Sequence, residues 1–297
     1  MGYLFLSLSL FAGSVKGYCG KRISNRTEGF RDAMLTNVIR MSLCMVIGLL
    51  IIILSGNPGK ILPDGATLAT SVLSGVSTAV FVVSWLLSVK NGAYMLVEVF
   101  IMLGVLVPIV SGIYIFHTPV RLNQWIGLLI LVAATLIMCS YNSSIKGTIN
   151  LKTVLLLTVS GLSSGLTDLS QKLFVEYSEN NITSVFNFYT YIFAGIVLLI
   201  FFSACSKKTE ARKTAIKNTR SIMGYIFIMA IALFANSFFK TKAAGFLAPA
   251  QLYPLSQGAA LMLSTLMAAF FFKERLTVKA VIGIVMSFAG IIIINVL

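Results

Sequence analysis

Residues 245–297 read GFLAPAQLYPLSQGAALMLSTLMAAFFFKERLTVKAVIGIVMSFAGIIIINVL. Two apolar runs flank one short charged turn, Lys273-Glu274-Arg275. Each run is long enough to cross the hydrocarbon core of a bilayer, which takes about 20 helical residues. The stretch therefore predicts a membrane hairpin, with Pro254 inside its first helix and Glu274 at its turn.

The whole chain has the composition of this hairpin. Of its 297 residues 58% are hydrophobic and 11% are charged, and the mean hydropathy is +0.94. Soluble domains contain about 25% charged residues, so the composition predicts a multi-pass membrane protein. The net charge of +14 lies in short loops between apolar segments, which indicates topology signals and contacts with lipid headgroups. A nucleic-acid partner is therefore not expected.

The cysteines do not form a metal-binding or disulfide pattern. Cys19, Cys44, Cys139 and Cys205 lie in or beside apolar runs, and none has CxxC spacing. We expect small buried hydrophobic residues, without a metal site or a cofactor. The chain opens directly into an apolar run that lacks a basic head, which predicts a retained first helix.

Apolar length and polar punctuation define the segments, and no soluble domain fits between them. The ten predicted membrane segments are residues 3–20, 33–55, 66–89, 93–116, 122–141, 152–175, 183–203, 221–240, 246–271 and 278–296. The predicted fold is an all-α integral membrane protein.

The chain also resembles itself. A shift of 156 residues places Gly127 on Gly283 and Ala133 on Ala289. We interpret this as two five-helix repeats, residues 1–145 and 146–297. Because five is odd, the second copy enters the membrane upside down, as in many secondary transporters.

Loop charges predict the orientation. Lys and Arg gather in the loops after the first, third, fifth, seventh and ninth segments. The alternate loops contain only Lys60, Arg121, Lys172, Lys240 and Lys242. The positive-inside rule places the basic loop 204–220 in the cytoplasm, so both termini of a ten-segment chain lie outside.

A family resemblance rests mainly on the second half. Tyr253-Pro254 is followed by Glu274-Arg275-Leu276-Thr277 and then by Ile282-Gly283. This order resembles the drug/metabolite transporter superfamily, specifically its ten-helix EamA type. In the first half, Arg40 matches an arginine often found in the second helix, and Gly13 to Lys21 matches the first-helix pattern.

The first half also departs from the family. Glu98 and Thr118 stand where the family has Pro and Glu. The family usually has cytoplasmic termini, whereas the loop charges of this chain predict external ones. The resemblance implies a transporter, with export as the expected direction.

Ionisable side chains inside the membrane are costly, by about 2.5–3.5 kcal/mol each on insertion scales, and mark functional sites. The candidates are Lys16, Arg40, Glu98, Asp168, Glu176 and Lys240. Glu176 and Lys240 lie near predicted helix ends, so we expect them to reach the membrane surface.

Two pairs among these candidates are predicted. Lys16 and Asp168 occupy equivalent positions of the two repeats, so we expect them to face a central cavity and pair with each other, with substrate or with a proton. Glu98 is a candidate proton carrier or cation site, and Arg40 is its possible partner or a ligand for an anionic substrate group. The alternative for both pairs is static neutralisation.

Uncharged polar residues near these positions are candidates to line the cavity or to hydrogen-bond between helices. They are Asn37, Tyr94, Asn236, Gln251, Tyr253 and Gln257. Pro254 is expected to kink its helix and free a carbonyl, and Glu274 to stabilise a helix junction. The spacing of Gly13 with Gly17 and of Gly161 with Gly165 predicts close helix contacts.

An enzyme is not expected. Gly161-Leu-Ser163-Ser-Gly165 matches GxSxG, but the only histidine, His117, lies in a turn far from this segment. No Walker sequence for ATP is present. The predicted function is secondary transport of a small metabolite or drug across the cell membrane by alternating access, with protons as possible coupling ions. Uptake is one alternative, and a non-transporting scaffold or sensor is another.

Overall fold

The computed structural model describes residues 1–24, 30–55, 61–90, 100–139, 151–205, 222–272 and 278–296, and every regular element within these ranges is helical. Within these ranges, ten α-helices are described: α1 (Gly2–Ser24), α2 (Phe30–Leu54), α3 (Gly65–Lys90), α5 (Leu106–Tyr114), α6 (Leu122–Cys139), α7 (Leu151–Tyr177), α8 (Thr183–Cys205), α10 (Met223–Ala244), α11 (Pro249–Phe272) and α12 (Val278–Val296). Each predicted segment overlaps one of them, and residues 93–99 of the fourth segment lie outside the described ranges.

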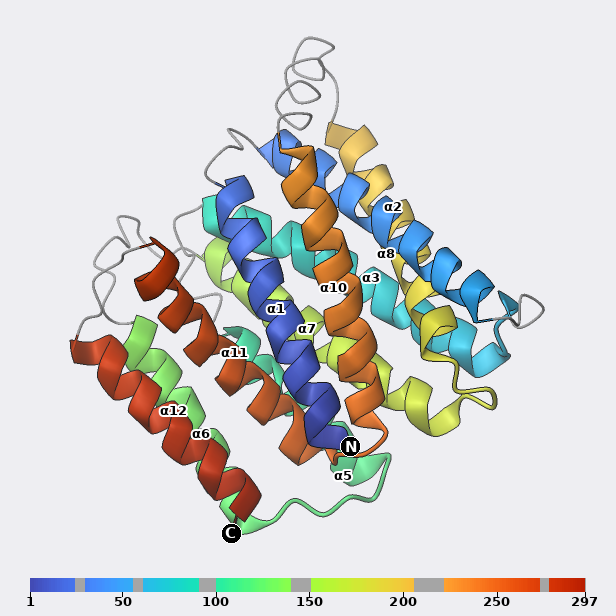
Figure 1. Ribbon diagram of the computed structural model, residues 1–297. Coiled ribbons are helices and arrows are strands. Elements are labelled where there is room, and N and C mark those ends of the chain that lie inside the picture. Colours follow the sequence, from blue (N-terminus) through green and yellow to red (C-terminus); the bar gives the residue numbers. More distant parts are fainter. Residues whose placement is uncertain are drawn as a thin grey trace.

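The helices have the length and composition of membrane spans. Four are long and apolar enough to cross a bilayer by themselves, within Phe30–Leu54, Gly65–Ser88, Thr183–Ala204 and Met223–Ala244. Phe100–Tyr114, Leu122–Ile137 and Val281–Ile294 are shorter apolar helices. α1 and α7 run beside them in the same bundle (Figure 1). The chain is an all-helical, multi-pass membrane protein.

The helices associate mainly as pairs from opposite halves of the chain. The most extensive pairs are α1 with α10, α3 with α7, α6 with α12, and α2 with α8. If the two halves of five helices correspond, α1 is equivalent to α7 and α3 is equivalent to α10. The α1–α10 pair and the α3–α7 pair are then equivalent contacts. Neither half is therefore a separate bundle.

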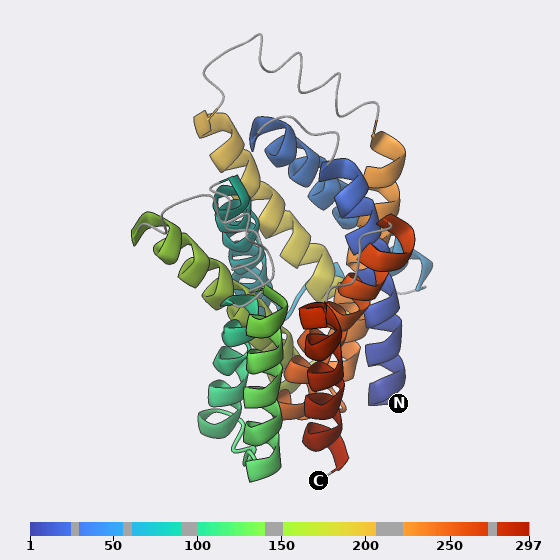
Figure 2. The same cartoon turned by 90° about the vertical axis from the view of Figure 1, so that its left-hand side faces the viewer.

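Both termini lie at one end of the bundle (Figures 1 and 2). The C-terminal end of α8 and the beginning of α10 lie at the opposite end, as Figure 1 shows. The basic stretch between these two helix ends falls on residues 206–221, which are outside the described ranges.

Apolar side chains cover both the inside and the outside of the bundle. One buried cluster joins α2, α3, α8 and α10 around Met41 and Leu198, and another includes Leu131 and Tyr253. On the outer surface, Leu129 is 66% exposed and Val285 is 63% exposed. An apolar surface of this kind suits contact with lipid tails.

Glycines permit the closest helix contact. A Cβ atom on Gly165 of α7 would overlap the carbonyl oxygen of Gly104 and lie 2.8 Å from Val107 Cβ. A Cβ atom on Gly104 would in turn overlap the carbonyl of Gly161. On α1, by contrast, a Cβ at Gly13 would lie 3.1 Å from Asn236 Nδ2, and Gly17 has open space.

We expect Gly165→Ala to destabilise the protein by about 1–3 kcal/mol, because overpacking forces the backbones apart. Gly17→Ala is the matched control, because the methyl group meets no neighbour there and Ala favours a helix. The thermal midpoints of both variants in detergent, read by size-exclusion chromatography after heating, provide the measurement. A Gly165→Ala midpoint at or above that of Gly17→Ala would contradict the close contact.

A carboxylate joins the start of α3 to the end of α7. Asp64 precedes α3 and accepts hydrogen bonds from the hydroxyl and the backbone N–H of Thr67, as an N-cap does. The Ser178 hydroxyl donates to Asp64 Oδ1 at 3.3 Å, and the Glu179 N–H donates to Oδ2 at 3.4 Å. Partial burial by itself raises the pKa of Asp64, but the hydrogen bonds from Thr67 and from the Glu179 N–H outweigh it and hold the pKa below its ordinary value.

We expect Asp64→Ala to lower stability at pH 7 by about 1 kcal/mol, the usual value of an N-cap. Because the folded-state pKa of Asp64 is lowered, its carboxylate stabilises the fold above the unfolded-state pKa of about 3.9, and this contribution is lost as pH falls through the folded-state value. The difference in thermal midpoint between wild type and Asp64→Ala should therefore shrink below about pH 4. Asp64→Asn retains a cap without a titrating charge, so the difference in thermal midpoint between Asp64→Asn and Asp64→Ala should not depend on pH. A similar shrinkage of that difference would refute this assignment.

Candidate functional site

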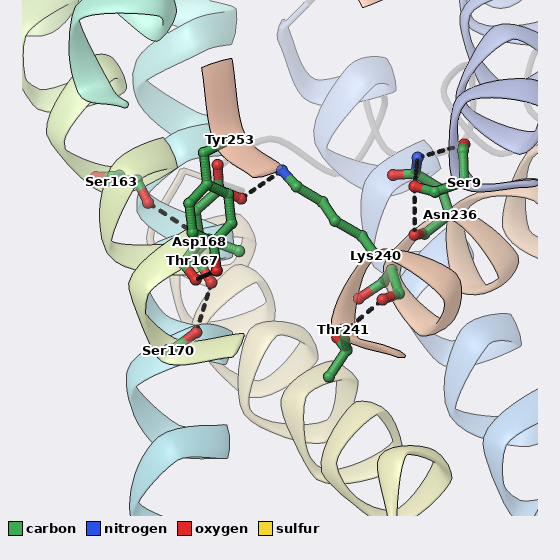
Figure 3. Close-up of polar contacts among 10 residues, drawn as sticks. Ser9, Ser163, Thr167, Asp168, Ser170, Asn236, Lys240, Thr241 and Tyr253 are labelled. Atoms are coloured by element: carbon green, nitrogen blue, oxygen red, sulfur yellow. Dashed lines mark hydrogen bonds and ion pairs between the residues drawn. The ribbon is translucent and has the colours of Figure 1, made fainter. Parts of the chain in front are cut away.

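A buried ion pair connects α7 and α10. Lys240 Nζ lies 2.6 Å from Asp168 Oδ1, and the side chains are only 11% and 6% exposed. Figure 3 shows the Lys240 side chain extending from α10 to Asp168 on α7. A charge removed from water is costly unless it is paired. Each of these two side chains therefore depends on the other.

The structure corrects two expectations about these charges. The predicted Lys16–Asp168 pair is wrong, because α1 packs along α10 and α11 and the ammonium that reaches Asp168 is that of Lys240. Lys240 was expected to reach the membrane surface from a helix end, but α10 continues for four residues beyond it, to Ala244. Its side chain is therefore directed into the bundle.

Tyr253 of α11 completes the arrangement. Its hydroxyl donates a 2.6 Å hydrogen bond to the backbone carbonyl of Asp168. The Lys240 ammonium lies 5.4 Å from the centroid of its ring, a distance at which a cation is attracted to an aromatic face. The next residue, Pro254, lacks an N–H, so it removes one hydrogen bond from α11 at this point.

Two buried oxygen atoms at this site have no hydrogen-bond partner among the described residues. They are Asp168 Oδ2 and Gln171 Oε1, three residues apart on α7. Buried acceptors without a donor are uncommon and costly. Gln171 was not among the predicted site residues, although its i,i+3 spacing from Asp168 places both on adjacent parts of one helix face.

Other predicted polar residues hold helices together or bond within their own helix. Asn236 Nδ2 donates to the carbonyl and to the hydroxyl of Ser9, which joins α10 to α1 (Figure 3). Asn37 Nδ2 donates to the Ala33 carbonyl of its own helix. Gln257 lines a very small cavity with Thr135, and Gln251 is half-buried at the start of α11.

Arg40 is placed differently from these residues. Its Nη1 lies 3.8 Å from Met229 Sδ, and its buried Nε has no hydrogen-bond partner in the part of the chain that the structure describes. The predicted partner Glu98 lies outside the described residues, as do Tyr94 and Glu274. The proposed Arg40–Glu98 pair therefore stays a prediction.

The GxSxG serine and the histidine lie in different surroundings. Ser163 is 5% exposed inside α7, and His117 is an exposed residue of the turn after α5. Glu176, near the end of α7, forms an ion pair with Lys172 at 3.2 Å with its side chain 47% exposed. Among the described residues, no group of three or more His, Cys, Asp or Glu side chains is placed to hold a metal ion.

Comparison with known families identifies the second half of the chain, which contains Asp168, Lys240 and Tyr253. Residues 151–296 match the EamA-like transporter family. The second half of the chain belongs to this family. EamA-like proteins of the drug/metabolite superfamily are membrane transporters, so the function class is transport.

Comparison with solved structures confirms the fold of this EamA-like protein over its whole length. A protein crystal structure superimposes with a TM-score of 0.76 at 13% sequence identity, over 99% of this chain and 96% of that one. At this identity the likeness concerns the fold alone. No curated protein matches the sequence.

We expect Tyr253→Phe to lower the stability of this EamA-like protein by about 1 kcal/mol, because it deletes a buried hydrogen bond and keeps the ring. Tyr177→Phe removes a hydroxyl from a side chain that is 53% exposed and is the matched control. Thermal midpoints in detergent measure both changes. Equal midpoints for the two variants would show that the bond to Asp168 contributes nothing.

Proposed function

We propose that this EamA-like protein exports a small metabolite or drug by alternating access and couples this export to protons at Asp168. The observation that carries the proposal is the buried Asp168–Lys240 pair, which has one partner on each of two packed helices. Ionisable groups at membrane depth mark substrate or proton pathways in transporters. Export is the direction that the family resemblance favours. Uptake is the alternative, and the experiment below tests both directions.

The pair provides a physical link between a proton and a substrate charge. The free Oδ2 atom of Asp168 is an acceptor that a proton can occupy without disturbing the Lys240 contact on Oδ1. Protonation removes the negative charge that compensates Lys240. The ammonium then needs another anion, because an unpaired buried charge is costly. A negatively charged group of the substrate meets that need.

Two inverted five-helix repeats, residues 1–145 and 146–297, provide the moving parts in this proposal. The equivalence of the α1–α10 and α3–α7 helix pairs supports this division. So do the hydrogen bonds inside these pairs, which are Ser9 with Asn236 and Ser84 with Ser160. Ser84 and Asn236 are 152 residues apart, as are Lys16 and Asp168.

The loop charges support an orientation with both termini outside the cell membrane. The described helix ends that flank residues 206–221 lie opposite the termini (Figure 1). By the positive-inside rule, this supports a cytoplasmic side at the end of the bundle opposite the termini.

Proton coupling is tested in proteoliposomes that contain a pH-sensitive dye and an imposed pH gradient. Amino acids, nucleosides and toxic organic cations are added in turn, on either side, and solute-dependent proton flux is recorded. We expect one class to release protons through the wild type and none through Asp168→Asn. Glu179→Gln, which removes an exposed carboxylate, is the control and should retain the flux.

A double variant separates coupling from structural neutralisation. Asp168→Asn alone leaves Lys240 unpaired, which costs about 3–5 kcal/mol and can prevent folding. Asp168→Asn with Lys240→Gln removes both charges and should restore the folded protein but not the proton flux. Undiminished proton flux through this double variant would reject the coupling role. The absence of flux in the wild type with every solute would favour a scaffold.

A further inference from the structure

A pocket opens at the bundle end of α7 and α10, separate from the Asp168–Lys240 pair. Its volume is about 550 Å³, which is in the range of small-molecule sites. It is formed by the beginning of α1, the end of α7, the beginning of α8 and the end of α10. Its lining includes the charged side chains of Lys172, Glu176 and Lys242 and the aromatic rings of Phe5 and Phe246.

The charged lining leaves one ammonium group available. Lys172 is 12% exposed and donates to Glu176 and, at 3.2 Å, to the Ala244 carbonyl. Lys242 lies 5.9 Å from the centroid of the Phe238 ring and pairs with no carboxylate among the described residues. With Glu176 neutralised by Lys172, the lining has an excess positive charge at Lys242.

The remaining lining is apolar on one side and polar on the other. The rings of Phe5 and Phe246 lie 5.8 Å apart and are tilted by 31°, and Val175 adds to this side of the pocket. Thr183 and Thr241 are polar lining residues. The Thr183 carbonyl accepts a hydrogen bond from Asn187, and the Thr241 hydroxyl donates one to the Ser237 carbonyl. Ser237 Oγ in turn donates to Asn187 Oδ1 at 2.5 Å.

We propose that this pocket binds a small organic anion, with a carboxylate or phosphate on Lys242 and an apolar body against Phe5 and Phe246. An ammonium with free donors is a strong ligand for these anionic groups. The inference rests on the proposed transport function and names its substrate class. Lys172 of the pocket lies one helical turn from Asp168 on α7, so the pocket is adjacent along that helix to the pair whose Lys240 protonation of Asp168 would leave uncompensated.

Binding is measured by calorimetry on the full chain in phosphatidylcholine nanodiscs. The probes are phenylacetate, phenyl phosphate and the neutral isostere phenylacetamide. We expect at least one anion to bind more tightly than the amide, and Lys242→Gln to weaken it about tenfold, as loss of a charge-assisted hydrogen bond does. Lys279→Gln, at an exposed lysine on α12, is the control and should leave binding unchanged. Absence of anion binding, or equal binding of the amide, would overturn the proposal.

A second arm distinguishes a soluble anion from a lipid headgroup, which offers the same phosphate chemistry. Phosphatidylglycerol is added to the nanodiscs. If this lipid displaces the probe from the pocket at Lys242, the site is assigned to lipid and the substrate role is overturned. A third arm uses Asp168→Asn with Lys240→Gln. Neither residue lines the pocket, so this variant should bind the anion without proton flux. A variant that loses proton flux but still binds the anion would thus separate failure of the proton coupling from failure of the pocket.

Discussion

The Asp168–Lys240 ion pair joins three helices at one place, because a charge removed from water is costly unless a counter-charge neutralises it. Asp168 on α7 and Lys240 on α10 neutralise each other, and Tyr253 on α11 contacts both through its hydroxyl and its ring. The energetic cost of a lone charge in a medium of low dielectric constant far exceeds that of most other contacts here. The relative position of α7 and α10 is therefore defined by chemistry as well as by apolar packing.

Close packing elsewhere uses small residues in place of charges. Residues 100–104 meet α7 through Gly104, Gly161 and Gly165, where the backbones approach too closely for side chains. Between α1 and α10 the contact is instead a pair of hydrogen bonds from Asn236 to Ser9. In lipid, where apolar burial does not favour one helix neighbour over another, such short-range contacts select the partners.

The sequence predicted the segments and much less of their contacts. Each apolar run coincides with a helix because membrane thickness dictates length. Tyr253 and Asp168 were both predicted to belong to the site, and the structure brings them together. The partner of Asp168 was missed, because equivalence between repeats does not define which helices touch. Gln171 was missed because an uncharged amide gives a weak signal, and Lys240 because its segment was predicted to end too early.

The Asp64 contact has a consequence for the balance between conformations. It joins the first half of the chain, at the start of α3, to the second half, at Ser178 and Glu179. If the halves rock as proposed, an end that is held by this carboxylate opens only when these hydrogen bonds break. Each 1.4 kcal/mol in such a contact changes the ratio of closed to open molecules about tenfold. Within the proposed alternating-access mechanism, the capping residue of α3 therefore biases which side of the transporter is open at rest.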